Sequence, residues 1–251
     1  MNTKLQSYTY KQNTLAYAPK LAGISTFFYR FFDILFSAIA IILFSPLLLL
    51  VSLVLKVTHD DEIFYKQERI GKGGKTFLVY KFTTMIKNSE YMGNGTITLK
   101  NDSRVFPFGK FLRKTKINEL PQLFNILKGD MSIVGPRPLP MERYRTYSDS
   151  VKQSINQVMP GLSGIGSILF RNEDEIFSRI QAEDKVRFYD EVIAPYKGKV
   201  EKWFVANKSL YLYFVVIFMT VFIVLFPQIK INYGKIFKGL PREPHELKGL
   251  L

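Results

Sequence analysis

The chain has 251 residues, which leaves room for one domain with membrane segments and excludes two large globular domains. Because 47% of the residues are hydrophobic, the composition excludes a disordered chain. With no cysteine and two histidines, the sequence excludes a disulfide framework, a cysteine nucleophile, a thiolate zinc site and a histidine-based metal cluster. The formal net charge of +14 is compatible with binding to nucleic acid, to an anionic membrane surface or to a phosphate-rich substrate. The sequence contains no recognisable nucleic-acid-binding module, and its apolar segments favour the membrane surface and the phosphate-rich substrate.

The first apolar segment follows a polar N-terminal arm at residues 1–26 and begins too late for a cleavable signal peptide. Its sequence, ILFSAIAIILFSPLLLLVSLVL, runs from residue 34 to residue 55 without a charge and is long enough to span a bilayer. Ser45 and Pro46 stand at its centre. Because Pro46 donates no backbone hydrogen bond and crowds the carbonyl of Ile42, we expect a kink there, with the Ser45 hydroxyl compensating for the freed carbonyl.

Basic residues flank this segment on both sides, whereas a single span normally concentrates them on one side. Together with the central Ser-Pro pair, the two basic flanks indicate a re-entrant helix over residues 27–58 that enters the membrane and returns to the same face. An ordinary kinked transmembrane helix explains the same residues, and the sequence alone leaves both interpretations open.

Residues 59–207 are mixed and charged, and they predict a soluble-facing catalytic domain with short strands (EIFYKQ, TFLVYKF) and amphipathic helices. The sequence GKGG at residues 71–74 lacks the spacing of a phosphate-binding loop and predicts a hairpin turn between the two strands. Further along, we expect a helix from about residue 182 to residue 193, ended by Pro195.

A second apolar segment, SLYLYFVVIFMTVFIVLFPQI, predicts a membrane or interfacial helix over residues 208–229. If it crossed the membrane, the basic tail at residues 230–251 would face outside, against the usual bias of positive charge towards the cytoplasm. We therefore expect a helix that lies in or dips into the same leaflet as the first. The whole pattern predicts a helix-rich α+β fold that is monotopic in the membrane.

The densest polar segment lies at residues 111–140. Its helical spacing predicts a helix at residues 119–127, with Asn118 as the N-cap and Glu119 at the positive end of the helix dipole, although a capped helix without a function is the plain alternative. Arg113 precedes this helix, and the sequence GPRP at residues 135–138 presents the Arg137 guanidinium on a stiff turn that suits a phosphate or a uracil edge. A carboxylate beside several cations can hold Mg²⁺ and a diphosphate, so Glu119 is the candidate metal ligand.

In this segment the chain resembles a known family. The run from residue 113 to residue 138 is similar to the hallmark of the bacterial sugar transferases, the monotopic phosphoglycosyl transferases. Collinear matches extend the resemblance from about residue 29 to about residue 209: RFFD before the broken apolar helix, QERIG at residues 67–71, YKF at residues 80–82 and PGLSG at residues 160–164. Such a collinear set is far more specific than one short motif.

The resemblance implies that the chain moves a sugar-1-phosphate from a UDP-sugar to polyprenyl phosphate and releases UMP, with Mg²⁺ as cofactor, at the start of bacterial glycan or exopolysaccharide assembly. It also implies a place in the bacterial inner membrane, with the catalytic domain on the cytoplasmic face and downstream glycosyltransferases among the partners. In that family, an aspartate at the start of the corresponding helix attacks the β-phosphate of the UDP-sugar. A phosphosugar–enzyme intermediate then reacts with polyprenyl phosphate, assisted by Mg²⁺ and the adjacent glutamate.

This sequence departs from the family pattern at the nucleophile, because residue 118 is Asn. A carboxamide is a poor nucleophile and a weaker Mg²⁺ ligand than a carboxylate. Thr83 is a second departure, since the family usually has a basic residue there. Three alternatives stay open: Glu119 is the nucleophile, the two substrates react directly while Asn118 orients a phosphate, or the chain is a catalytically inactive membrane adaptor.

Basic residues supply the candidate substrate contacts. Arg137 is the first of these, and its plain alternative is a structural arginine that bonds loop carbonyls. Arg113 and Lys81 are expected at phosphates, although a solvated basic face also explains Lys81. Arg69 belongs to the QERIG match, and Arg171 would either reach the nucleotide or pair with a neighbouring acidic residue.

Overall fold

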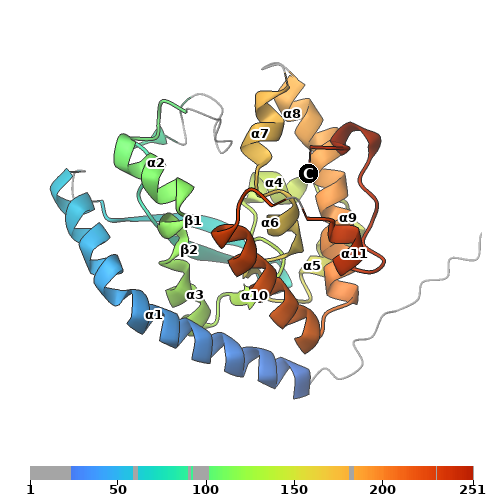
Figure 1. The fold of residues 1–251 in the computed structure, drawn as a ribbon, viewed down its shortest axis with the longest axis horizontal. Coiled ribbons are helices and arrows are strands. Elements are labelled where there is room, and N and C mark those ends of the chain that lie inside the picture. The colour runs from blue at the N-terminus through green and yellow to red at the C-terminus, as the bar shows by residue number, and fades with distance from the viewer. Residues whose placement is uncertain are drawn as a thin grey trace, which may run out of the picture.

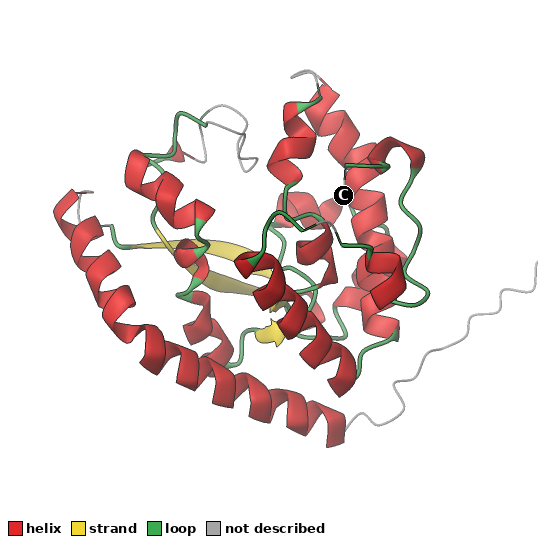
Figure 2. Cartoon of the chain, viewed as in Figure 1, coloured by secondary structure: helices red, strands yellow, loops and turns green. Residues whose placement is uncertain are grey.

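The computed structural model describes residues 24–58, 62–89, 92, 102–180, 184–229 and 231–250, so the expected N-terminal arm lies outside the described residues except at its end. Helices surround two small sheets, and one long helix runs along a side of the domain (Figures 1 and 2). The α+β, helix-rich class expected from the sequence is confirmed. The helices and strands are α1 (Ile24–Thr58), β1 (Phe64–Ile70), β2 (Thr76–Phe82), α2 (Pro107–Lys114), α3 (Gln122–Lys128), β3 (Ser132–Val134), α4 (Met141–Arg145), α5 (Asp149–Ile155), β4 (Gly161–Ser163), α6 (Ile165–Leu169), α7 (Glu173–Ser178), α8 (Lys185–Phe188), α9 (Ala194–Ala206), α10 (Leu210–Leu225) and α11 (Tyr233–Ile236).

The long helix α1 continues through Pro46 for 35 residues. Ser45 Oγ donates to the carbonyl oxygen of Ile42 at 2.8 Å, so the expected compensation for the missing proline N–H is confirmed. The expected kink is wrong, because α1 curves smoothly over its whole length (Figure 1). With the freed carbonyl satisfied and the domain supporting the helix on both sides of the proline, no sharp break forms.

Two charged side chains attach the first half of α1 to the domain. Arg30 donates to the carbonyl oxygens of Ile126 and Leu127, the latter at 2.7 Å, and so satisfies the C-terminal end of α3. Asp33 is 3% exposed, and its Oδ1 accepts three hydrogen bonds. The donors are Ser132 Oγ at 3.0 Å, the backbone N–H of Ile133 at 2.9 Å and Tyr213 Oη at 2.8 Å. A buried carboxylate with this many donors ties α1 to β3 and α10.

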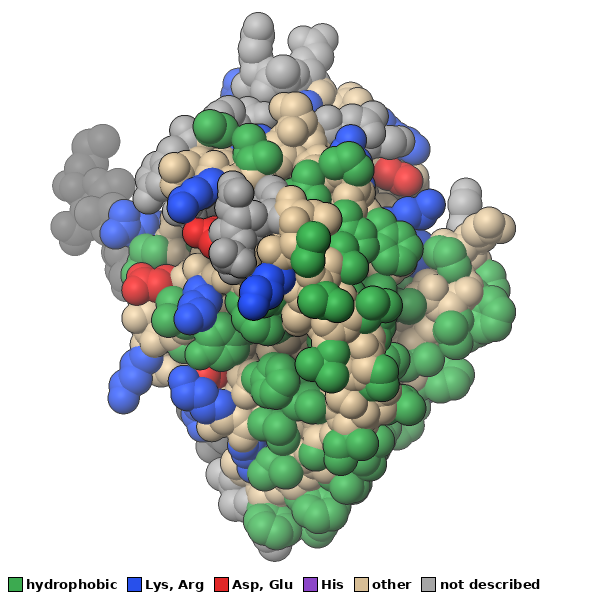
Figure 3. All heavy atoms as spheres, turned by 90° about the vertical axis from the view of Figure 1, so that its left-hand side faces the viewer, with side chains coloured by type: hydrophobic (Ala, Val, Ile, Leu, Met, Phe, Trp, Pro, Cys, Tyr) green, Lys and Arg blue, Asp and Glu red, His purple; other side chains and the backbone are tan. Residues whose placement is uncertain are grey.

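The second half of α1 is attached by apolar contacts. Leu48, Val51 and Leu55 are buried against Phe82 of β2 and Leu112 of α2. The opposite side of α1 is apolar and exposed, and hydrophobic side chains gather along this side of the molecule (Figure 3). Among the described residues, α1 is the one helix whose length and composition would allow it to cross a membrane.

The strands form two separate pairs. β1 and β2 are antiparallel, and the turn between them contains Gly73 with φ 71°, a conformation that favours glycine. The hairpin expected at residues 71–74 is therefore confirmed. β3 and β4 pair in parallel, with Ser132 opposite Gly161, which brings the loop after β3 beside the segment around Pro160.

The C-terminal part of the domain buries a large apolar cluster between α6, α9 and α10. The helix that was expected to end at Pro195 does not end there: α8 passes through a π-helical stretch, Tyr189–Ile193, into α9, which begins at Ala194. Pro195 is the second residue of α9 and directly follows the change from π-helix to α-helix. The second apolar helix is confirmed as α10, and the basic tail packs back on the domain through the buried Phe237 and Leu247.

Candidate active site

Glu119 lies on a 3₁₀ turn, Ile117–Glu119, immediately before α3. The expectation that Asn118 is the N-cap of this helix is wrong, because α3 begins at Gln122 and Pro121 occupies the N-cap position. The fixed φ of Pro121 suits a helix start, and this moves the start past Asn118. Asn118 is instead 7% exposed, and its Oδ1 has no hydrogen-bond partner in the part of the chain that the structure describes.

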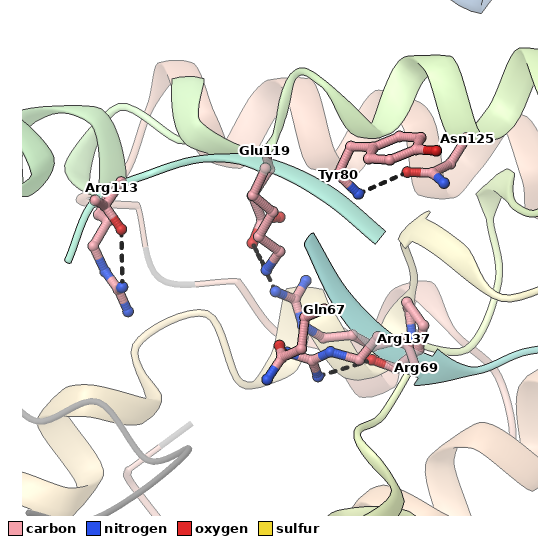
Figure 4. A network of polar contacts seen from close by, with 10 residues as sticks. Gln67, Arg69, Tyr80, Arg113, Glu119, Asn125 and Arg137 are labelled. Atoms are coloured by element: carbon pink, nitrogen blue, oxygen red, sulfur yellow. Dashed lines mark hydrogen bonds and ion pairs between the residues drawn. The ribbon is translucent and has the colours of Figure 1, made fainter. Parts of the chain in front are cut away.

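The Glu119 carboxylate binds two cations from distant parts of the chain (Figure 4). Its Oε1 accepts from Arg137 Nη2 at 2.7 Å and from Lys81 Nζ at 3.3 Å. Burial alone would raise the pKa of Glu119, but the charges of Arg137 and Lys81 outweigh it and hold that pKa well below its usual range. Glu119 is therefore ionised at neutral pH.

The loop that carries Arg137 is fixed by backbone contacts with the next strand. The N–H of Gly135 donates to the carbonyl of Ser163 at 2.9 Å, and the N–H of Gly161 donates to the carbonyl of Pro136 at 2.8 Å. A Cβ at Gly135 would lie 2.3 Å from the carbonyl oxygen of Met159, so only glycine allows this close approach. Arg137 thus projects from a rigid turn, as the GPRP sequence predicts.

The β1–β2 hairpin carries Lys81 and brings a third cation, Arg69, to the same place. Arg69 donates to the carbonyl oxygen of Pro138 at 3.2 Å and also binds Gln67. Burial lowers the pKa of Arg69 to about 10, and the nearby charge of Arg137 adds to the effect. Burial also lowers the pKa of Lys81 to about 8, against the opposing attraction of Glu119. Both side chains are buried, and the low dielectric constant of such a site strengthens their attraction for a negatively charged ligand.

These side chains line a small depression together with Gln122, whose Nε2 is buried without a partner among the described residues. Lys81 and Arg137 bind the Glu119 carboxylate, and Arg69 lines the same depression, so three cations stand against one carboxylate at the site. Such a site can bind an anion with more than one phosphate. The sequence predicted the cations but missed Gln122, although it lies within the same dense segment.

The remaining candidates make other contacts. Arg113 donates to Thr84 Oγ1 at 3.3 Å, and its side chain lies to the left of Glu119 in Figure 4 and extends in the same direction. Thr83 is buried, so the position that is usually basic in the family faces the interior here. Arg171 donates to the carbonyl oxygens of Ile223 and Pro227 at 2.9 and 2.7 Å, and these contacts place it at the C-terminal end of α10 rather than in the Glu119 cluster.

The comparisons with known proteins agree with this geometry. A family model described as bacterial sugar transferase matches residues 24–227, which extend from α1 to the end of α10. The chain belongs to the bacterial sugar transferase family. The resemblance inferred from the sequence motifs is therefore confirmed, and the Glu119 cluster lies inside the matched segment.

Two of the relatives compared with the chain are named for a reaction on undecaprenyl phosphate. The chain is 36% identical over 216 residues to an undecaprenyl-phosphate galactose phosphotransferase from Salmonella typhimurium, covering 80% of this chain and 41% of that protein. It is 41% identical over 152 residues to a UDP-N-acetylgalactosamine-undecaprenyl-phosphate N-acetylgalactosaminephosphotransferase from Aeromonas hydrophila, covering 58% and 35%. An exopolysaccharide production protein from Sinorhizobium fredii is 39% identical over 183 residues, covering 67% and 79%. The chain thus spans less than half the length of the first two relatives.

Proposed function

We propose that this chain transfers a sugar-1-phosphate from a UDP-sugar to undecaprenyl phosphate and releases UMP. The observation that carries the proposal is the pair of hydrogen-bonded ion pairs that Arg137 and Lys81 form with the ionised Glu119. All three residues lie inside the segment that the family model matches. The names of the Salmonella and Aeromonas relatives supply the substrate class. The name of the Sinorhizobium relative supports a role in exopolysaccharide production. We place the reaction at the start of glycan assembly, with later glycosyltransferases as consumers of the product.

The diphosphate of the UDP-sugar would compete with Glu119 for Arg137 and Lys81. Binding would move these cations onto the phosphates, where they stabilise the charge that develops on the departing UMP. The released Glu119 carboxylate would then lie beside the β-phosphate. Its attack forms a bond from carboxylate oxygen to phosphorus as the bond to UMP breaks, and undecaprenyl phosphate displaces it in a second step. Glu119 takes this role because Asn118 cannot carry the negative charge.

Mg²⁺ fits the same position. No group of three or more metal-ligating side chains occurs within the described ranges, but Mg²⁺ is usually bound by one or two carboxylates and by the substrate phosphates. Glu119 supplies such a carboxylate, and the Oδ1 of Asn118, its neighbour in the chain, is buried without a hydrogen-bond partner among the described residues. A bound Mg²⁺ would neutralise charge on the diphosphate.

The attachment of α1 bears on how the chain lies in the membrane. Buried contacts with the domain extend from Asp33 to Leu55, a helix length of about 33 Å, which matches the hydrocarbon core of a bilayer. A perpendicular span would therefore draw the polar domain into lipid. We infer that α1 lies in one leaflet of the bacterial inner membrane, with the catalytic domain on the cytoplasmic face.

α10 extends the same membrane-facing surface. Phe214 of α10 packs edge-on against Phe32 and Phe36 of α1, and Phe218 and Leu225 of α10 are exposed. We expect this face of α10 to contact lipid in the same leaflet.

The test is release of UMP from a panel of UDP-sugars by the full chain in detergent. Release should require undecaprenyl phosphate for turnover and should be lost in Glu119→Gln, which keeps the shape of the side chain and removes its charge. An active chain indifferent to Glu119→Gln would refute the assignment of the site. A folded chain that releases no UMP from any UDP-sugar would favour the alternative function as a catalytically inactive membrane adaptor. That alternative is motivated by Asn118 at the position of the family's nucleophile.

A further inference from the structure

A buried amide at the candidate active site lacks a hydrogen-bond partner. Gln122, the first residue of α3, is 2% exposed and lines the small depression together with Arg69, Lys81 and Arg137. Its Nε2 is buried and has no partner within the described part of the chain. A buried N–H group without an acceptor costs free energy, and buried polar groups in folded proteins are nearly always hydrogen-bonded. The packing of the fold alone gives no reason for an amide at this position.

The side chains that the structure places around this depression offer Gln122 no acceptor. Lys and Arg side chains carry hydrogen-bond donors only, so three of the lining residues cannot accept from Nε2. The two others, Val79 and Pro138, have apolar side chains. The Glu119 carboxylate is bound to two of the cations instead. Donors therefore converge on the depression, and a ligand is the natural source of an acceptor for Gln122.

Burial places Gln122 at the inner end of the depression. The exposed fraction of the side chain falls from 41% for Arg137 to 18% for Lys81, whereas Gln122 is 2% exposed. An anion that enters past Arg137 therefore passes Lys81 before it reaches Gln122. The low dielectric constant of a buried site strengthens a hydrogen bond to a charged oxygen, so the inner position favours a phosphate oxygen as the acceptor.

Gln122 also differs from the cations in what a ligand has to displace. Arg137 and Lys81 would release Glu119 when they bind a phosphate, and Arg69 already donates to a loop carbonyl oxygen. The Nε2 of Gln122 has no such bond to give up, so its contact with a ligand adds to affinity without an opposing loss. The unfavourable burial of the amide exists in the free protein, and binding of an acceptor would relieve it.

We propose that Gln122 binds the diphosphate of the UDP-sugar, with Nε2 donating a hydrogen bond to a non-bridging phosphate oxygen. The inference rests on the proposed function, because it assigns Gln122 to the same substrate. It predicts an unusual pair of effects: removal of the amide weakens binding of the ligand but does not destabilise the free protein. A residue that only supports the fold behaves in the opposite way, since its loss lowers stability.

The experiment measures the UDP affinity by calorimetry and the Tm of the full chain in detergent, for the native chain and for Gln122→Met. Methionine has a similar length but no donor, so UDP should bind about tenfold more weakly. The Tm without ligand should stay level or rise, because a buried polar group without a partner has been removed. A UDP-sugar that the native chain binds should lose affinity to the same extent as UDP, since the two share the diphosphate.

Two further variants separate the donor from the packing of α3. In Gln122→Glu the new carboxylate would pair with the cations of the depression, so the Tm should rise and UDP should bind even more weakly than to Gln122→Met. Leu123→Ala is the matched control on the same helix, because Leu123 is buried but does not line the depression. Its truncation should lower the Tm and leave UDP affinity within about threefold of the native value.

Three results would overturn the inference while leaving the proposed function intact. The first is UDP affinity within about threefold of the native value in folded Gln122→Met or Gln122→Glu. The second is a drop in the Tm of Gln122→Met as large as that of Leu123→Ala, which would make Gln122 a support of the fold. The third is a loss of affinity for the UDP-sugar but not for UDP, which would place the contact on the sugar. A native chain that binds no UDP would instead overturn the proposed function, and this inference with it.

Discussion

Asn118→Asp tests the one position at which the chain departs from its family's nucleophile. The substitution adds a charge to a side chain that is 7% exposed and whose Oδ1 has no partner among the described residues. Since Asn118 is not a helix N-cap, α3 offers the new charge no cap hydrogen bond. We expect the uncompensated carboxylate to lower the free energy of unfolding by about 2 kcal/mol, and so to lower the Tm by about 4–8 °C.

Mg²⁺ should reverse this loss, because a carboxylate binds the ion better than a carboxamide and would share it with Glu119. The assay is thermal melting of Asn118→Asp with Mg²⁺ and with a chelator, alongside Mg²⁺-dependent release of UMP, which should rise or appear. Asn125→Asp is the matched control: this buried Asn donates to the Leu78 carbonyl at 2.7 Å and accepts from the Tyr80 N–H at 3.0 Å, so its loss of stability should not respond to Mg²⁺. An equal drop in Tm with and without Mg²⁺, and no gain in UMP release, would refute the reasoning.

Three further predictions follow from the same contacts. Arg137→Ala should weaken UDP binding by about 2 kcal/mol in calorimetry because a charge-assisted contact is lost, and unchanged affinity in a folded variant would remove Arg137 from the binding site. UDP affinity should fall as the pH rises through about 8, since Lys81 has a pKa of about 8 and loses its charge above it. Lys81→Arg stays charged and should lose most of this dependence; an identical pH profile would contradict the role of Lys81. Single cysteines at Thr26 and Thr58, in a chain that has none, should both resist an impermeant thiol reagent applied to intact cells. Labelling at Thr26 alone would show that α1 spans the membrane.

Local patterns predicted the local structure well. The hairpin at residues 71–74 and the bond from Ser45 to Ile42 follow from glycine and proline chemistry that acts within a few residues. The presentation of Arg137 was also predictable, because flanking prolines stiffen a turn whatever surrounds it. Pro195 and Asn118 show the limit of such patterns. Proline occurs both after the end of a helix and in its first turn, so Pro195 alone does not show where a helix ends. An Asn caps a helix only if the helix begins directly after it, and α3 begins further along the chain than Asn118.

Contacts between distant segments could not be predicted from the sequence. Arg30 and Asp33 were recognised as part of a family match, yet their partners lie about a hundred residues or more along the chain. The meeting of Lys81 with Glu119 likewise depends on how the hairpin docks against α3.

The hydrogen bonds of Asp33 also set an order of events during synthesis. This carboxylate sits at the start of an apolar helix, and its last partner, Tyr213, is 180 residues further along the chain. At a translation rate of about 5–20 residues per second, α1 would wait roughly 9–36 s for that partner. Until all three donors have been made, the incompletely bonded Asp33 charge opposes burial of α1 in hydrocarbon. On the membrane placement proposed above, α1 would reach its final depth only after the domain has folded against it.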